Sequence, residues 1–149
     1  MSQDPNCFKL SKSISMIYRN GKAYIDQAMS HHNISSGQYI FLFYLFNHNG
    51  STQDQISKAL DMDKATTTRA VQKLESIGLV RRERNSDDHR INNVFITEEG
   101  NALRKELYKV AMDWDDLLLQ KLTPDERSTL QKLIGKLSEN SKTHKKQTI

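Results

Sequence analysis

Apolar residues recur three and four positions apart along most of the 149-residue chain, which is the spacing of one helix face. Stripes of this kind run from Ile14 to Ala28, from Leu103 to Leu119 and from Leu130 to Leu137. A different pattern interrupts them, because segments 79–81 and 91–96 are typical of short strands joined by a charged turn. The sequence therefore predicts a mainly α fold with a small β-hairpin.

Helix start signals divide this pattern into separate elements. In a capping box, the first side chain accepts a backbone N–H from the helix and the side chain three residues later accepts one in return. The chain has such pairs at Ser35 with Gln38, Thr52 with Gln55, and Thr123 with Glu126. We expect Thr97 to cap one long helix that continues to about residue 121. The predicted order is four helices, the hairpin, the long helix and a last helix.

Two short helices precede the hairpin. The first spans residues 53–60, and after a tight turn Asp63 can cap a second helix that spans 63–77. The inward face of the second helix is expected to hold Thr67, Ala70, Val71, Leu74 and Ile77. The outward face carries hydroxyl, amide and cationic groups on Lys64, Thr66, Thr68, Arg69, Gln72 and Lys73.

Groups of this kind can donate hydrogen bonds to phosphates and base edges, and threonine methyls can contact thymine. Two helices joined by a tight turn and followed by a hairpin are typical of a winged helix-turn-helix. A solvated helix has the same polarity, so the outward face alone leaves DNA contact and simple hydration both open. The hairpin favours DNA contact, because an isolated hairpin is marginally stable unless it is packed or used.

Charge and composition agree with this interpretation. The formal net charge is +4, and residues 64–84 contain six basic and two acidic residues. A single cysteine, Cys7, excludes an intrachain disulfide framework and favours a cytoplasmic protein. We expect no secretory signal and no membrane span, since no apolar run approaches the roughly 18 residues that a span needs.

Catalytic and metal-binding motifs are absent from the sequence. The five histidines form no HExxH motif and no i, i+4 pair, and there is no cysteine cluster. We therefore expect no metal and no cofactor, although histidines dispersed along the chain can still meet in the fold. The sequence also has no nucleophile motif and no phosphate-binding glycine loop, so an enzyme is not expected.

Residues 50–100 resemble the DNA-binding core of the MarR/SlyA family of bacterial transcriptional regulators. The resemblance rests on four features of this sequence: Leu-Glu-Ser-Ile-Gly-Leu-Val at 74–80, Asp88-His89-Arg90, Ile96-Thr97, and Gly100. Ile96 stands where leucine is usual in the family. Outside residues 50–100 only the number and order of the helices agree.

The resemblance implies one domain over residues 1–149, which acts as a homodimer. Its dimerisation helices would span about 9–33 and 101–144, and its winged helix-turn-helix about 34–100. Helix 63–77 would enter the major groove of a pseudo-palindromic DNA operator, and wing 81–96 would enter the minor groove. Independently, the three apolar stripes are more than one small domain buries easily, which also favours a dimer over a monomeric bundle.

The same resemblance assigns roles in the wing. Arg90 would be the minor-groove arginine and Asp88 the acid that orients it through a hydrogen bond, which would reduce the ordering cost on binding. Phosphate contact is expected for Arg82 and Arg84, which lie on one side of an alternating strand with Arg81 on the other.

The family also implies regulation by a small aromatic or anionic effector, and a repressor is expected, with activation left open. Tyr18, Arg19, Tyr39, Phe43 and Tyr44 could line an effector pocket, although an aromatic stripe is also what an ordinary core requires.

Two alternatives remain open. One is a winged-helix module for protein–protein interaction that does not bind DNA. The other is a thiol-based redox-sensing regulator that uses Cys7, by similarity to the hydroperoxide-sensing branch of the family. In that branch the cysteine lies about one helical turn nearer the next helix, close to where Ser11 stands here.

Overall fold

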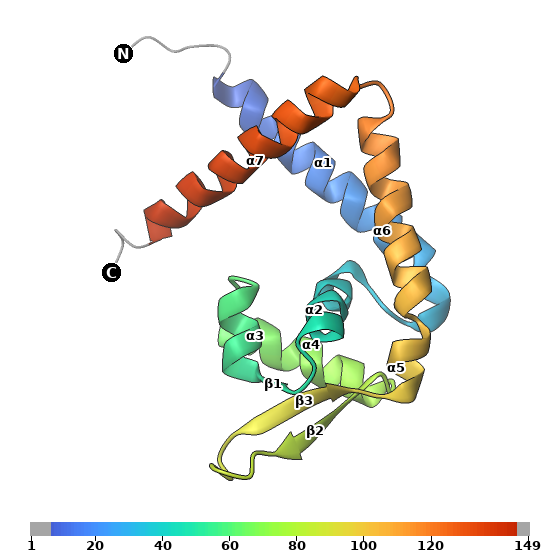
Figure 1. Cartoon of the computed structure of the whole chain (residues 1–149), viewed down its shortest axis with the longest axis vertical. Helices are drawn as coiled ribbons and strands as arrows, with labels where there is room; N and C mark the ends of the chain where they lie inside the picture. The colour runs from blue at the N-terminus through green and yellow to red at the C-terminus, as the bar shows by residue number, and fades with distance from the viewer. Residues whose placement is uncertain (1–6, 146–149) are drawn as a thin grey trace. The chain divides into compact units, whose positions relative to one another are not determined.

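The computed structural model describes residues 7–145, with side chains from 9 to 142. The chain divides after Met112 into two compact units. The first unit holds α1 (Cys7–Ala28), η1 (Ser30–His32), α2 (Ser36–Asn47), β1 (Ser51–Thr52), α3 (Gln53–Ala59), α4 (Lys64–Ser76), β2 (Val80–Arg84), β3 (Asn92–Ile96), α5 (Glu98–Ala102) and the first turns of α6 (Arg104–Leu119) (Figure 1). The second unit holds the rest of α6 and α7 (Pro124–Lys145). The predicted mainly α fold with a small sheet is confirmed.

The core of the first unit is built around α2. Its segment Phe41–Phe46 is apolar on nearly every side, as expected for a helix surrounded by other elements. Leu42 and Leu45 are completely buried together with Val71 and Leu74 of α4. The same cluster also includes Met29, Ile34, Val80, Val94 and Leu107. The burial of Val71 and Leu74 in this core sets which face of α4 points outward.

The sheet has three antiparallel strands in the order β1-β3-β2, where the sequence predicts only two. The additional strand, β1, is two residues long and pairs Ser51 with Val94 of β3. In the hairpin, Arg82 lies opposite Val94, and pairing continues to Arg84 opposite Asn92. The predicted first strand, 79–81, is therefore too short, because residues 83 and 84 extend the ladder instead of forming the turn.

Local capping confirms most of the predicted helix starts. Both halves of the capping box are present at Ser35 and at Thr52. At the start of α7, the Thr123 backbone N–H donates to Glu126 at 2.8 Å and the Thr123 hydroxyl accepts from the Glu126 N–H at 3.3 Å. These bonds form between residues three positions apart, so the sequence alone is sufficient to predict them.

The prediction of one long helix that begins at Thr97 is wrong in one respect. Thr97 caps a helix through the Gly100 N–H, but that helix, α5, ends at Ala102 and α6 begins at Arg104. Leu103 between them has ψ −7°, far from the α-helical value of about −42°. Leu103 therefore separates the two helices, although its carbonyl accepts the Leu107 N–H at 2.9 Å.

The second unit exposes a series of large apolar side chains on its helices. They are Leu117, Leu118, Leu130, Leu133, Ile134 and Leu137, each between 37% and 51% exposed. Within residues 7–145, no helix combines the length and the apolar character that crossing a membrane requires.

Candidate nucleic-acid interface

Asp63 fixes the start of α4. Its carboxylate accepts hydrogen bonds from the Thr66 backbone N–H and the Thr66 hydroxyl, both at 2.7 Å. The hydrogen bond from the Thr66 hydroxyl is the main reason that the pKa of Asp63 lies below its ordinary value. The predicted helix, 63–77, agrees with the structure, in which Asp63 is the N-cap and Ile77 the C-cap.

The two faces of α4 differ as predicted. Thr67, Ala70, Val71 and Leu74 are buried, and Ile77 is half-buried. On the opposite face, Lys64, Arg69, Gln72 and Lys73 are exposed, and Thr66 and Thr68 are half-buried. Ala65 is also exposed on α4 and adds a methyl group that the sequence analysis did not include.

Two contacts from α3 reach the start of α4. Gln53 donates its side-chain amide to the Thr68 hydroxyl at 3.2 Å, and Asp54 pairs with Lys64 at 3.1 Å. Gln53 and Asp54 therefore border the outward face of α4, a position that the sequence does not indicate for them. No local pattern could indicate it, because the contacts depend on how α3 and α4 pack.

The turn of the wing is organised by asparagine and aspartate side chains. The Asn85 side-chain oxygen accepts the N–H groups of Asp87 at 2.8 Å and Asp88 at 3.2 Å. The Asp88 carboxylate in turn accepts the backbone N–H of Arg90 at 2.9 Å. In addition, the Asn85 N–H donates to the Ile91 carbonyl at 2.9 Å and closes the turn. In Figure 1 this turn lies at the end of the hairpin opposite to α5.

The predicted hydrogen bond between Asp88 and the Arg90 guanidinium is not found in the described structure. Asp88 holds the backbone of Arg90 rather than its side chain. Among the described side chains, from 9 to 142, none pairs with the Arg90 guanidinium, and Arg90 lines a hollow of about 190 Å³ with Thr52, Gln53 and Asp54. The short spacing explains the difference, because a carboxylate readily reaches an N–H two residues ahead, as in an Asx-turn.

The arginines of β2 also differ from one another. Arg82 donates Nε to Glu75 of α4 at 2.9 Å, and its Nη2 donates to the same oxygen. This hydrogen bonding lowers the pKa of Glu75. Arg81, on the other side of the strand, lies 5.0 Å from the ring centre of Phe95 and donates to Glu83 at 2.8 Å. Arg84 is exposed, and no described side chain pairs with it.

The expected cations therefore form two groups. Lys64 and Arg82 have carboxylate partners within the protein, at Asp54 and Glu75. Lys73, Arg84 and Arg90 have none among the described residues, and Arg69 donates to the Thr66 hydroxyl at 3.2 Å. Cations without an internal partner can approach a polyanion without first breaking an ion pair.

The aromatic residues considered for an effector pocket, and Cys7, lie outside α4 and the wing. Tyr39 and Phe43 pack edge to face at 4.7 Å, and Phe43 packs on Tyr108 at 4.8 Å, next to the buried core. They therefore form part of the core packing, whereas Tyr18 is 71% exposed. Cys7 is the first residue of α1, and its side chain lies outside the described part of the chain.

Comparisons with known proteins agree with this architecture. The sequence model of the MarR family matches residues 34–91. A MarR transcriptional regulator from Methanosarcina mazei Go1 is 35% identical, and its crystal structure has a TM-score of 0.84 over 90% of this chain and 96% of that chain. A mutant of MarR from E. coli, solved in complex with operator DNA, is 25% identical with a TM-score of 0.80 over 92% and 99% of the two chains. The HTH-type transcriptional regulator BilQ of Clostridioides difficile is 24% identical over 123 residues, 83% of each protein.

The first of these similarities extends over nearly the full length of both chains, at an identity that is high enough to show common descent as well as a common fold. The family model covers the part of the chain that contains α2, α3, α4 and most of the wing. The chain therefore belongs to the MarR family of DNA-binding transcriptional regulators and is not an enzyme.

Proposed function

We propose that the protein binds a pseudo-palindromic DNA operator as a homodimer and acts as a repressor. In each protomer, α4 enters the major groove and wing 81–96 enters the minor groove. One observation carries this proposal: α4 is fixed by a buried inner face and by Asp63, while its outward face carries cations and hydrogen-bond donors. Such a helix can enter a groove without being reorganised.

The proposed DNA contacts of α4 are of two kinds, to phosphates and to base edges. Lys64, Arg69 and Lys73 are placed to neutralise phosphates. Gln72 and Thr68 have side chains that can read base edges, whereas the Thr66 hydroxyl already donates to Asp63 and leaves its methyl group for apolar contact. Thr68 is already oriented by the Gln53 amide, which leaves its hydroxyl hydrogen free to donate to an acceptor on DNA. Lys64 contacts a phosphate only when it leaves Asp54, so its net contribution is smaller than that of Lys73.

In the wing, Arg90 is the side chain proposed to enter the minor groove. A narrow minor groove concentrates negative potential, and a guanidinium loses its hydration more easily than an ammonium does. Asp88 supports this role by fixing the backbone from which Arg90 projects. Arg84 is proposed to contact phosphate, and Arg82 does so only if it exchanges Glu75 for the DNA backbone.

Uncovered apolar faces support the homodimer. On α1, Leu10, Ile14 and Ile17 are 44–53% exposed at the spacing of one helix face. On α7, Leu130, Leu133, Ile134 and Leu137 are 37–51% exposed at the same kind of spacing. A second copy of the chain would cover these faces if the helices of segments 9–33 and 101–144 interleave, with segment 34–100 left to bind DNA.

We also propose that a small anionic or aromatic effector modulates DNA binding. Support comes from a hollow of about 320 Å³ in the first unit, lined by Phe46, Asn49, Thr97, Glu98 and Arg104 among others. The Arg104 guanidinium lies 5.1 Å from the centre of the Phe46 ring and donates to the Phe46 carbonyl at 2.7 Å. A carboxylate or an aromatic ring would meet the Arg104 cation and the Phe46 side chain there.

Selection of bound sites from random-sequence duplexes tests the proposed function. We expect an enriched sequence with two inverted half-sites about one helical turn apart, bound with an affinity that falls steeply with salt. The absence of DNA binding at low salt would instead favour a winged-helix module for protein–protein interaction. A ligand screen on the selected complex would then identify compounds that release the DNA.

A further inference from the structure

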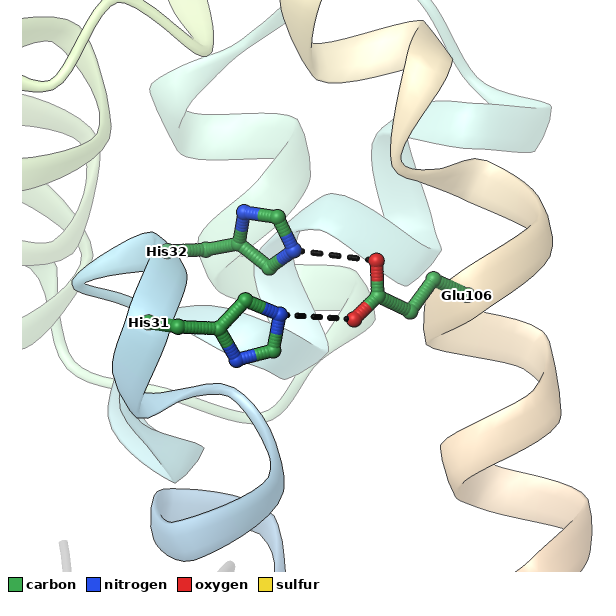
Figure 2. Close-up of side chains that lie close together, drawn as sticks. All are labelled: His31, His32 and Glu106. Carbon is green, nitrogen blue, oxygen red and sulfur yellow. Dashed lines mark hydrogen bonds and ion pairs between the residues drawn. The ribbon is translucent and has the colours of Figure 1, made fainter.

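Two histidines and one glutamate come together in the first unit, away from α4 and the wing. His31 and His32 lie in η1, and Glu106 lies near the start of α6 (Figure 2). His31 Nε2 lies 3.0 Å from one carboxylate oxygen of Glu106, and His32 Nε2 lies 2.9 Å from the other. The sequence did not predict this cluster, because its members are 74 and 75 positions apart.

Buried neighbours hold the cluster in place on both sides. Met29, which is completely buried, accepts the His32 backbone N–H at 3.0 Å. Asn33 adopts a left-handed conformation with φ 56° and closes η1 by donating its N–H to Ser30 at 3.0 Å. On the other side, Leu107 is completely buried and fixes the backbone next to Glu106. The three side chains therefore converge from segments anchored by buried residues and backbone hydrogen bonds.

We propose that His31, His32 and Glu106 form a binding site for a divalent transition-metal ion such as zinc. Imidazole nitrogen suits zinc, copper and nickel, and sites with two histidines and one carboxylate are an established zinc ligand set. All three ligand atoms lie within 4.8 Å of one another. The Glu106 side chain is 41% exposed and His32 25%, so water can reach the ion and complete its coordination.

An ion would require the three side chains to rearrange around it. Zinc binds nitrogen at about 2.0–2.1 Å and carboxylate oxygen at about 2.0–2.2 Å, so tetrahedral ligand atoms lie roughly 3.3 Å apart. The N···O separations of 3.0 and 2.9 Å join the two histidines to different oxygens of Glu106, and the three ligand atoms lie within 4.8 Å of one another. Rotation of the His31 and Glu106 side chains must bring all three ligand atoms to the tetrahedral spacing. Both imidazoles must present an unprotonated Nε2 to the ion, so the affinity for the metal decreases as the solution is acidified.

A simpler arrangement would give the same distances. Two imidazole N–H groups that donate to one carboxylate form a hydrogen-bonded cluster that holds η1 against α6 without any ion. The pKa of Glu106 lies below its ordinary value, mainly because of the hydrogen bond with His32. Only a direct test of metal uptake separates the two arrangements.

The test is a titration of the full chain, prepared without an affinity tag and treated with a chelator, first with Co²⁺ and then with Zn²⁺. We expect one ion per chain, visible absorption bands from Co²⁺ in a low-symmetry site, and displacement of Co²⁺ by Zn²⁺. His32→Ala and Glu106→Gln should each lower the affinity at least about tenfold. His48→Ala is the matched control, because His48 lies outside the cluster and its Nδ1 faces the Tyr44 carbonyl at 3.1 Å.

Thermal unfolding supplies a second measurement. Zn²⁺ should raise the melting temperature of the unchanged chain and of His48→Ala but not that of Glu106→Gln, since an ion that binds only the folded state stabilises it. If His32→Ala fails to fold, His31→Ala replaces it, because the His31 side chain is 60% exposed. The proposal is overturned if the unchanged chain takes up no ion, or if the cluster variants bind the metal as tightly as His48→Ala.

Discussion

The Asp88 carboxylate accepts the backbone N–H of Arg90 at 2.9 Å, and it makes no bond to the guanidinium. The acid therefore shapes the turn of the wing, and the Arg90 side chain projects from a fixed backbone. In this arrangement the role of Asp88 depends on its ability to accept a hydrogen bond rather than on its negative charge. The two properties can be separated by substitution.

Asp88→Asn keeps a side-chain oxygen that can accept the Arg90 N–H, whereas Asp88→Ala removes it. We expect Asp88→Ala to weaken binding to the selected duplex about fivefold, equal to the ~1 kcal/mol typical of one hydrogen bond. Asp88→Asn should bind as well as the unchanged protein or better, because it also removes a negative charge that faces DNA. Fluorescence anisotropy at fixed salt measures both. An equal loss in the two variants would mean that the charge of Asp88 acts on the guanidinium after all.

Lys73 is exposed on α4 and has no carboxylate partner among the described residues. If it neutralises one phosphate, Lys73→Ala should reduce the slope of log affinity against log salt by about one unit without changing the preferred sequence. Titrations at several salt concentrations measure the slope. Lys22→Ala, an exposed lysine of α1, is the control and should leave the slope unchanged. A slope that Lys73→Ala also leaves unchanged would remove Lys73 from the interface.

Glu75 joins α4 to the wing through Arg82, and the hydrogen bonds from Arg82 lower its pKa from the ordinary value of 4.5. A carboxyl whose pKa is lower in the folded state stabilises the fold above its unfolded pKa and loses this effect as pH falls through the folded pKa. Glu75→Gln should therefore lower the free energy of unfolding by about 1 kcal/mol at pH 7, and the difference should decrease below about pH 4.5. Urea denaturation at a series of pH values measures it. A difference that stays constant with pH would exclude an ionic origin.

Gly100 packs where a side chain does not fit. A Cβ added there would lie 2.2 Å from the Leu79 carbonyl oxygen and 3.0 Å from the Ile96 side chain. Because a backbone carbonyl cannot rotate away, Gly100→Ala should destabilise the fold by about 1–3 kcal/mol. Gly37→Ala is the matched control, since its Cβ would meet only the Ser35 hydroxyl at 3.4 Å. Denaturant unfolding compares the two. Equal free energies of unfolding for the two variants would show that α5 can move away from Leu79 without destabilising the fold.

Features set by residues close together in sequence could be predicted. The caps at Ser35, Thr52 and Asp63 depend on bonds to residues three positions ahead, and the inner face of α4 follows from helical spacing. The order of helices and hairpin followed from the same signals. The cationic outward face of α4 could also be predicted, because a residue opposite a buried stripe must face outward.

Features set by tertiary packing could not be predicted. Strand β1 is two residues long and exists only because β3 lies beside it. The pairing of Arg82 with Glu75 depends on how β2 lies against α4, so strand alternation predicted the face of Arg82 but not its partner. The cluster of His31 with Glu106 spans 75 positions and has no local signature. The sequence shows that Asp88 and Arg90 are two positions apart, but it does not show which atoms of Arg90 the carboxylate contacts.

We propose that the MarR-type winged helix of this chain binds its operator with Arg90 in the minor groove. A salt-matched titration of Arg90→Ala with the selected duplex, alongside its melting temperature, tests this placement. We expect affinity to fall by about tenfold to a hundredfold, the range for losing one well-placed arginine contact, with the melting temperature nearly unchanged. Unaltered affinity would contradict the claim.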